Sequence, residues 1–224
     1  MKALYPLLAL LLMGATGPCG TAVRSSAGSY GYLGGGFGPA PSENVTSDGN
    51  VVTVDQAMGD RMFTVITTRY DAKTLTLLSS KLRASCCGSY WNSSVTRNAD
   101  GSYDVEAQMT SGEDVYKESR TRMHVAANEP INIGGLFFLP FMYHATQAAE
   151  ILQVDFSPIM TGYLRVQQTA AAPYPANVPA HDKALIVTSM RTRRSAILWY
   201  DPCTFALDAY GTRDGRVEVR TAVL

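Results

Sequence analysis

Residues 102–125, SYDVEAQMTSGEDVYKESRTRMHV, decide the fold class of this chain. Side chains of a strand point alternately to its two faces, so each face of this segment can be read separately. One face carries Tyr103, Val105, Ala107 and Met109, and the other carries Asp104, Glu106 and Gln108. The turn at 110–114 contains a glycine that can take positive φ, and a second strand follows over Val115–Val125. The segment therefore predicts an antiparallel hairpin with one buried face and one solvent face.

A similar strand-and-turn pattern extends over most of the chain, where short segments rich in Val, Thr, Tyr and Ile alternate with turn residues. We predict about ten short strands in all. Besides the hairpin they are Val51–Asp55, Arg61–Tyr70, Thr74–Ala84, Tyr90–Arg97, Gly162–Thr169, Lys183–Met190, Ser195–Tyr200, Thr204–Tyr210 and Arg216–Leu224. The predicted fold class is mainly β, an antiparallel β-sandwich-like fold with one interior helix, because no alternation of strands and helices indicates a parallel sheet.

The interior helix is expected directly after Pro140, a residue suited to the first turn of a helix. Apolar residues recur there at helical spacing, namely Phe141, Ala145, Ala148 and Leu152. Pro158 prevents the helix from continuing.

The N-terminal residues divide into two expected segments. Residues 1–22 place one lysine before an apolar run and then small residues, which is the pattern of a secretory signal peptide. Residues 23–49 are rich in Gly, Ser and Pro and are expected to form a flexible tether. The β-rich domain then covers 50–224 as one unit, with two halves at 50–130 and 160–224 as the alternative.

The mode of processing stays open between two main readings, with an uncleaved anchor as a third. Gly20-Thr21-Ala22 is a small-x-small cleavage site, whereas Cys19 resembles the lipid-attachment cysteine of bacterial lipoproteins. Either reading predicts an exported protein, located in the periplasm, at the outer membrane or outside the cell. A membrane association is expected only through a lipid on Cys19, since the apolar run is too short to span a bilayer.

Two neighbouring cysteines stand in the stretch ASCCGSYWN at 84–92. The segment from Cys87 to Trp91 resembles the Cys-Gly-Ser-Cys-Trp stretch around the nucleophile of papain-like cysteine proteases, but the nucleophile position is Tyr90 here, which excludes that activity. In an exported chain we expect a structural disulfide that joins Cys203 to Cys86 or Cys87, because closing a long loop stabilises most. A bond between Cys86 and Cys87 and a set of free thiols are the alternatives.

Composition excludes some functions and leaves others without a signal. Nineteen Lys and Arg residues balance nineteen Asp and Glu residues, so no field attracts a polyphosphate, and no nucleic-acid partner is predicted. The sequence contains neither a nucleophile elbow nor a zinc-binding His-Glu-x-x-His, so we predict no catalytic residue, no metal site and no cofactor. His181, Asp182 and Asp201 are the only candidates for a pocket of titratable groups.

The terminal segment Arg216–Leu224 alternates apolar and polar residues, so it either closes the sheet or lies at its edge. At an edge it could bind a partner protein of the cell envelope by strand addition. Whether the chain is an enzyme stays uncertain, with a non-enzymatic role favoured. The predicted function is an exported, β-rich cell-envelope protein that binds or scaffolds another component, and the alternative is an exported hydrolase whose active site has no recognisable motif.

Overall fold

The computed structural model describes residues 26–32, 42–58, 63–112, 114–127, 129–133, 138–156, 159–169, 184–203, 205, 207–212 and 217–222. One helix and fifteen strands lie in these ranges. In chain order they are β1 Ser26–Tyr32, β2 Ser42–Ser47, β3 Val51–Met58, β4 Phe63–Asp71, β5 Leu77–Cys86, β6 Ser89–Arg97, β7 Tyr103–Ser111, β8 Asp114–Met123, β9 Ile131–Ile133, α1 Leu139–Thr146, β10 Glu150–Phe156, β11 Ile159–Thr169, β12 Ala184–Ser189, β13 Ser195–Tyr200, β14 Leu207–Thr212 and β15 Val217–Ala222.

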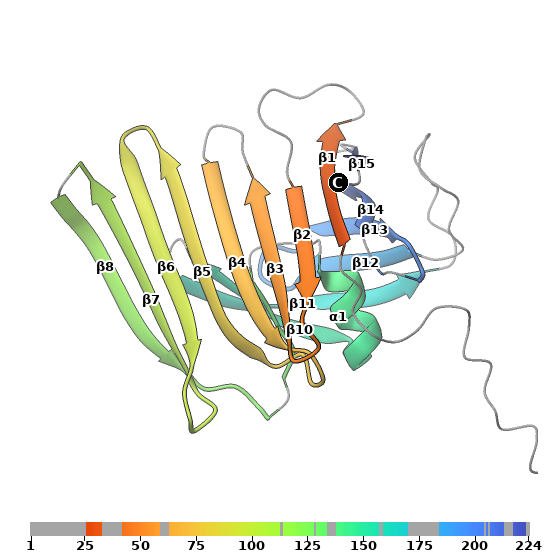
Figure 1. The fold of residues 1–224 in the computed structure, drawn as a ribbon, viewed down its shortest axis with the longest axis horizontal. Helices are drawn as coiled ribbons and strands as arrows, with labels where there is room; N and C mark the ends of the chain where they lie inside the picture. The colour runs from red at the N-terminus through yellow and green to blue at the C-terminus, as the bar shows by residue number, and fades with distance from the viewer. Residues whose placement is uncertain are drawn as a thin grey trace, which may run out of the picture.

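All of these strands belong to one sheet in the order β8-β7-β6-β5-β4-β3-β2-β1-β15-β14-β13-β12-β11-β10-β9 (Figure 1). Neighbouring strands pair antiparallel, except that β9 pairs parallel with β10. The ladder between β1 and β15 joins the N-terminal strands to the C-terminal strands, and it connects Ser29 with Ala222. The predicted antiparallel, mainly β fold is thus confirmed, with more strands than expected.

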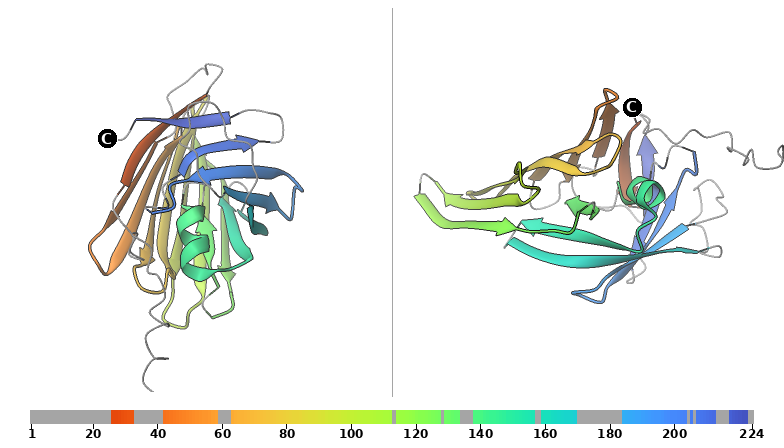
Figure 2. Two further views of the ribbon diagram at one scale, coloured as in Figure 1. Left: turned by 90° about the vertical axis from the view of Figure 1, so that its right-hand side faces the viewer. Right: turned by 90° about the horizontal axis from the view of Figure 1, so that it is seen from below.

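The sheet folds over so that its two ends form two facing layers with α1 between them (Figure 2). One hydrophobic cluster contains Val54 and Ile66 from one layer and Leu164 and Leu198 from the other. The helix contributes Met142, which is fully buried, to the same cluster. This two-layer packing is the sandwich-like arrangement that one-sided strands require.

The hairpin at 102–125 forms as the alternation predicts. Tyr103 and Val105 are buried on the inner face of β7, while Glu106 is exposed on the outer face. Its second strand begins at Asp114 and ends at Met123, and the regular pairing of β7 with β8 has one bulge.

Residues 26–32 and 42–47 do not belong to a flexible tether, contrary to the expectation for 23–49. They form β1 and β2, which lie in the middle of the sheet order between β15 and β3. Val45 on β2 is 4% exposed and joins the core. The composition misleads here because a strand between two others gains its stability from backbone hydrogen bonds on both sides, which need few large side chains.

The helix is shorter than its apolar periodicity suggests. It ends at Thr146, and Gln147 takes a left-handed conformation with φ 53°. Leu152, expected on the helix, lies on β10 opposite Ile131 of β9. In a buried segment of few residues, helical and strand periodicities are hard to distinguish, and here the ladder to β9 and β11 decided the outcome.

The terminal strand is an interior strand and not an edge. β15 pairs with β14 on one side and with β1 on the other, so closure of the sheet is the expectation that the structure shows, and β15 is not the edge strand on which the expected partner site along Arg216–Leu224 depended. The edges of the described sheet are instead β8 and β9. Among the described residues, no helix has the length and apolarity required to cross a membrane.

Candidate binding surface

The outer face of β4–β8, which points away from the core, carries exposed apolar side chains in one line across the strands. The pairing register places Phe63 opposite Ser85, Ser85 opposite Tyr90, Tyr90 opposite Thr110, and Thr110 opposite Val115. Directly paired residues share a face, so these side chains form one cross-strand row. Phe63, Tyr90 and Val115 are 54%, 53% and 52% exposed. We name these three residues the apolar row.

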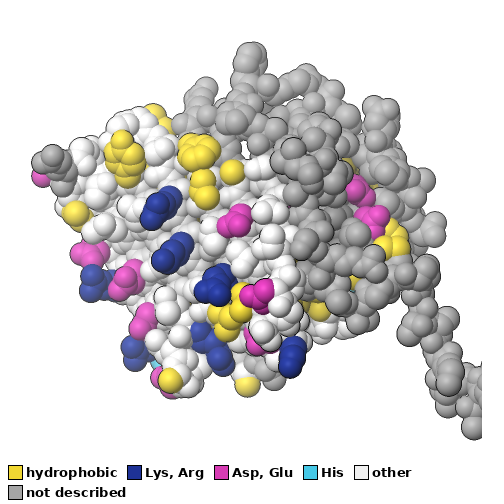
Figure 3. Space-filling model, in the orientation of Figure 1, with side chains coloured by type: hydrophobic (Ala, Val, Ile, Leu, Met, Phe, Trp, Pro, Cys, Tyr) yellow, Lys and Arg dark blue, Asp and Glu magenta, His cyan; other side chains and the backbone are white. Residues whose placement is uncertain are grey.

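Three cations lie on the same face, beside the apolar row. Arg83 is the next outward residue after Ser85 on β5, Lys81 follows it, and Arg69 on β4 pairs with Ser79 one step further. All three are exposed. We name Arg69, Lys81 and Arg83 the cationic line, and Figure 3 shows Lys and Arg side chains following one another below exposed hydrophobic side chains on this face.

The charges on the neighbouring strands form close ion pairs, whereas the described charges of the cationic line do not. Arg122 Nε donates to Asp104 Oδ1 at 2.8 Å, and Arg120 Nη2 lies 2.8 Å from Glu118 Oε1. The hydrogen bond from Arg122 lowers the pKa of the Asp104 carboxyl, which stays ionised at neutral pH. Within the described residues, no carboxylate forms an ion pair with Lys81 or Arg83, and Arg69 has only a longer-range electrostatic interaction with Asp48.

The same face is hollowed between β5 and β8. A depression of about 270 Å³ is lined by Lys81 and Arg83 on one side, by Glu118 and Arg120 on the other, and by the side chains of Asn92 and Gln108 among others between them. Amide groups can both donate and accept hydrogen bonds. The surface thus combines apolar contact area, unpaired positive charge and neutral hydrogen-bonding groups within one concave face.

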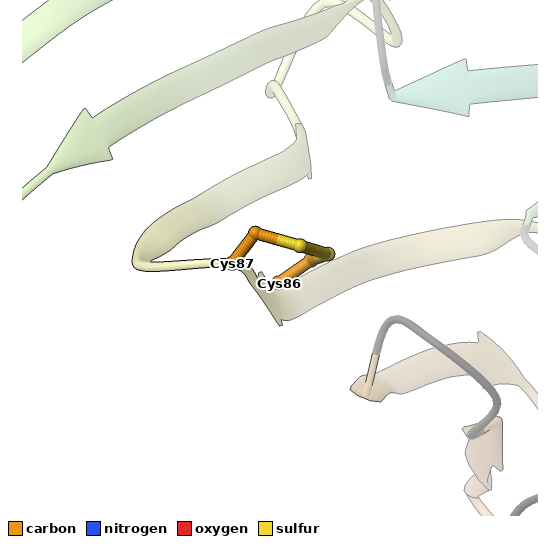
Figure 4. Close-up of a disulfide and its surroundings, with 2 residues drawn as sticks. All are labelled: Cys86 and Cys87. Atoms are coloured by element: carbon orange, nitrogen blue, oxygen red, sulfur yellow. A yellow bond between two sulfur atoms is a disulfide. The ribbon is translucent and has the colours of Figure 1, made fainter.

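The neighbouring cysteines lie at one end of this surface, in the turn between β5 and β6 (Figure 4). Cys87 and Gly88 have φ of 57° and 81°, the conformation of a two-residue hairpin turn. Cys86 and Cys87 form a disulfide with each other, so the predicted bridge from Cys203 to either of them is wrong. Cys203 takes part in another disulfide. Loop-closure entropy favoured a long-range bridge from the sequence, but the turn holds both thiols side by side at the tip of a hairpin.

A polar and aromatic cluster lies where α1 meets the C-terminal strands. His144 Nε2 is 2.8 Å from the hydroxyl of Tyr200, and Gln168 Nε2 donates to that hydroxyl at 3.2 Å. The ring of Phe205 stacks on His144 with centroids 4.5 Å apart. These hydrogen bonds connect the helix to β13 and β13 to β11.

Of the three residues predicted to form a titratable pocket, the structure describes only Asp201. His181 and Asp182 lie outside the described residues. Asp201 accepts a hydrogen bond from the backbone N–H of Cys203 at 2.8 Å, which is the role of an aspartate in a turn. Within the described ranges, no group of three His, Cys, Asp or Glu residues could hold a metal ion.

The binding surface itself escaped sequence reasoning, because the alternation assigns residues to a face and does not align separate strands. Phe63, Tyr90 and Val115 are far apart in the chain and meet only through the register of four ladders. The signal that could have indicated them is the presence of apolar residues at outward positions near strand ends.

Comparison of the chain with protein-family models, with curated proteins and with solved structures finds no match.

Proposed function

We propose that the protein is an exported, non-enzymatic binding component of a cell envelope, and that the outer face of β4–β8 binds an acidic segment of a partner protein. One observation carries the proposal, namely the alignment of the apolar row beside the unpaired cationic line. Isolated exposed apolar residues are common on soluble proteins, but an aligned set beside unpaired charges is typical of interaction sites.

Each feature of the surface supports a part of the partner's chemistry. Phe63 and Tyr90 offer large apolar areas with few rotatable bonds, which makes aromatic residues efficient anchors at interfaces. The cationic line favours a negatively charged partner and accelerates its association. The concave shape around Asn92 and Gln108 fits a chain-like ligand better than a flat membrane.

Export is supported by the signal-like residues 1–22 and by the disulfide chemistry of the chain. Expression of the full chain in a bacterium, followed by fractionation and mass spectrometry, tests this part. We expect the mature protein outside the cytoplasm, beginning at Val23 or carrying a lipid on Cys19. An uncleaved chain that stays in the cytoplasm would contradict export.

The binding proposal is tested with two labelled synthetic peptides, one alternating Glu with Leu and one alternating Lys with Leu. We expect fluorescence anisotropy to show binding of the acidic peptide only, weakening as salt screens the charges. The variants Arg83→Glu and Lys81→Glu should each weaken binding about threefold to tenfold, and Phe63→Ser by a similar factor. Arg165→Glu, on β11 and outside the surface, is the matched control and should leave binding unchanged.

Equal binding of both peptides, or acidic-peptide binding that survives Arg83→Glu and Lys81→Glu together, would overturn the proposal. Vesicles of anionic lipid form a third arm of the experiment. If the protein bound such vesicles and neither peptide, the surface would be a membrane contact and the protein-partner proposal would fail.

A further inference from the structure

The strand β8 is an open edge of the described sheet. It pairs with β7 along its length, and no other described strand pairs with it. It is 10 residues long and lies at the left-hand end of the sheet in Figure 1. Such a strand presents backbone N–H and C=O groups on its outer side that can pair with a further strand.

Both faces of β8 are accessible as well as its edge. Glu118 and Arg120 point to the outer face and are exposed. Lys117 and Thr121 share the face of the core residues of β7 but are also exposed. Figure 2 shows β8 at the far end of its layer. An incoming strand would therefore meet no described element in its way.

The charged residues of β8 are complementary to those of a second, antiparallel copy of β8 in one register. When two copies extend one sheet, paired residues must share a face, so the two-fold axis passes through a residue of β8. An axis at Glu118 or at Arg120 would set a charged residue opposite its own copy. An axis at Ser119 instead sets Glu118 opposite Arg120 twice, and Lys117 opposite Thr121.

We propose that the protein forms a two-fold dimer in which β8 pairs antiparallel with β8 of a second copy, with Ser119 opposite Ser119. Each Arg120 then lies between Glu118 of its own chain, which it contacts at 2.8 Å, and Glu118 of the second copy. Opposite charges across strands stabilise the pairing, and like charges across strands oppose it. The regular pairing extends over Lys117–Thr121, because a bulge interrupts β8 between Val115 and Lys117.

Charged residues on an edge strand can also serve to prevent pairing. Lys117, on the core-facing side of β8, is such a charge, but Glu118 and Arg120 attract each other across the axis in the register centred on Ser119. A monomer under all conditions would identify these charges as protective and would overturn the proposal.

The dimer has a consequence for binding that the single chain lacks. Since the axis runs perpendicular to the sheet, the outer faces of both copies point to the same side. Two copies of the apolar row and the cationic line then face one partner. Simultaneous contact with two acidic segments would raise the apparent affinity without any new contact within each surface.

The register is tested by cross-linking. The two Cα atoms of a pair centred on the axis are about 4.5–5.5 Å apart, which suits a disulfide. We expect Ser119→Cys to form a covalent dimer readily under mild oxidation. Lys117→Cys alone and Thr121→Cys alone should not, because each cysteine lies about 13 Å from its own copy. A mixture of the two variants should cross-link, since these positions face each other.

The charge pairing is tested by a swap. Glu118→Arg or Arg120→Glu creates like-charge pairs twice in the interface, so we expect sedimentation equilibrium to show at least tenfold weaker dimerisation. The double variant E118R/R120E restores opposite charges and should restore the dimer. Arg83→Glu is the matched control, because Arg83 is an exposed cation on β5, outside the interface, and forms no ion pair within the described residues.

Circular dichroism and urea unfolding of each variant show whether it folds, which separates loss of the dimer from loss of the fold. Cross-linking of Ser119→Cys that is no faster than that of Lys117→Cys would overturn the proposal. So would a double variant that dimerises no better than either single variant. Ser119→Pro blocks strand pairing at the centre of the interface. If this variant is a folded monomer, it should still bind the acidic peptide. Its peptide binding therefore tests the binding proposal separately from the dimer.

Discussion

Tyr70 shows how a single side chain holds the two layers together. Its side chain is 1% exposed, and its hydroxyl donates to the backbone carbonyl of Ile131 at 3.3 Å. Its ring stacks on Phe138 just before α1, with centroids 5.1 Å apart. Burial raises the pKa of the Tyr70 hydroxyl well above its usual value, because the ionised form cannot be solvated in the core.

We predict that Tyr70→Phe lowers the free energy of unfolding by about 1 kcal/mol at neutral pH, since the carbonyl of Ile131 loses its donor. Tyr90→Phe removes the hydroxyl of an exposed side chain, so it is the control and should change the free energy of unfolding little. Urea unfolding followed by circular dichroism measures both. An unchanged midpoint for Tyr70→Phe would show that water replaces the lost hydroxyl.

The pKa of Tyr70 also predicts a loss of stability in alkali. The unfolded tyrosine ionises near pH 10, while the folded one stays neutral. Stability is therefore complete below pH 10 and falls as the pH rises above it, by up to about 1.4 kcal/mol per pH unit for this group. Tyr70→Phe should flatten that slope in unfolding curves measured between pH 9 and pH 11, and an unaltered slope would contradict the assignment.

Cys86 and Cys87 are adjacent in sequence, so their bond closes almost no loop. In the chain-entropy account such a disulfide contributes little to global stability. We predict that the double variant Cys86→Ala, Cys87→Asn changes the free energy of unfolding by less than about 1 kcal/mol, with Asn chosen because it tolerates the positive φ of the turn. A large loss in urea unfolding would mean that the bond supports the hairpin directly.

At the scale of elements, the sequence predicted whether a segment forms a helix or a strand more reliably than it predicted which elements lie beside that segment. The helix after Pro140 exists, but its end at Thr146 depends on β10 pairing with β9 and β11. The strand predicted from the alternation in β7 is confirmed, because the alternation of side chains depends only on residues within that strand. Segments rich in glycine, such as β1, carry no such alternation and became strands through their neighbours.

The helix α1 is held by its buried apolar side chains and also by hydrogen bonds to one buried hydroxyl. Tyr200 is 2% exposed, and its hydroxyl contacts both His144 and Gln168. We predict that Tyr200→Phe lowers the free energy of unfolding by about 1 kcal/mol, because the half-buried side chains of His144 and Gln168 each lose a hydrogen-bond partner. In a double-mutant cycle, His144→Phe should cost less in the Tyr200→Phe background than alone, measured by urea unfolding. Strict additivity would show that the two side chains do not interact.

At the scale of the whole molecule, residues near opposite ends of the chain complete one sheet. The ladder between β1 and β15 is the connection between the N-terminal and the C-terminal strands in the sheet order. Many of the contacts are therefore long-range, which is typical of slowly folding β proteins.

We predict that a chain beginning at Asn50 does not fold, although its sequence contains the whole expected β-rich domain. It lacks β1 and β2, so it uncovers the edges of β3 and β15 and removes Val45 from the core. A chain beginning at Ser25 keeps both strands and is the control. Cooperative thermal unfolding should be present in the control and absent in the shorter chain, and a cooperative transition in the shorter chain would make β1 and β2 dispensable.

The sequence by itself determined that the chain forms antiparallel strands with one wet face, because side-chain alternation and turn chemistry are local properties. Only the tertiary structure decided that β15 is an interior strand, that Cys86 pairs with Cys87, and that β8 is an edge. It also decided that Phe63, Tyr90 and Val115 form one row. The physical reason is that strand order and register depend on backbone hydrogen bonds between distant segments, and the backbone groups that form these bonds are the same in every residue except proline.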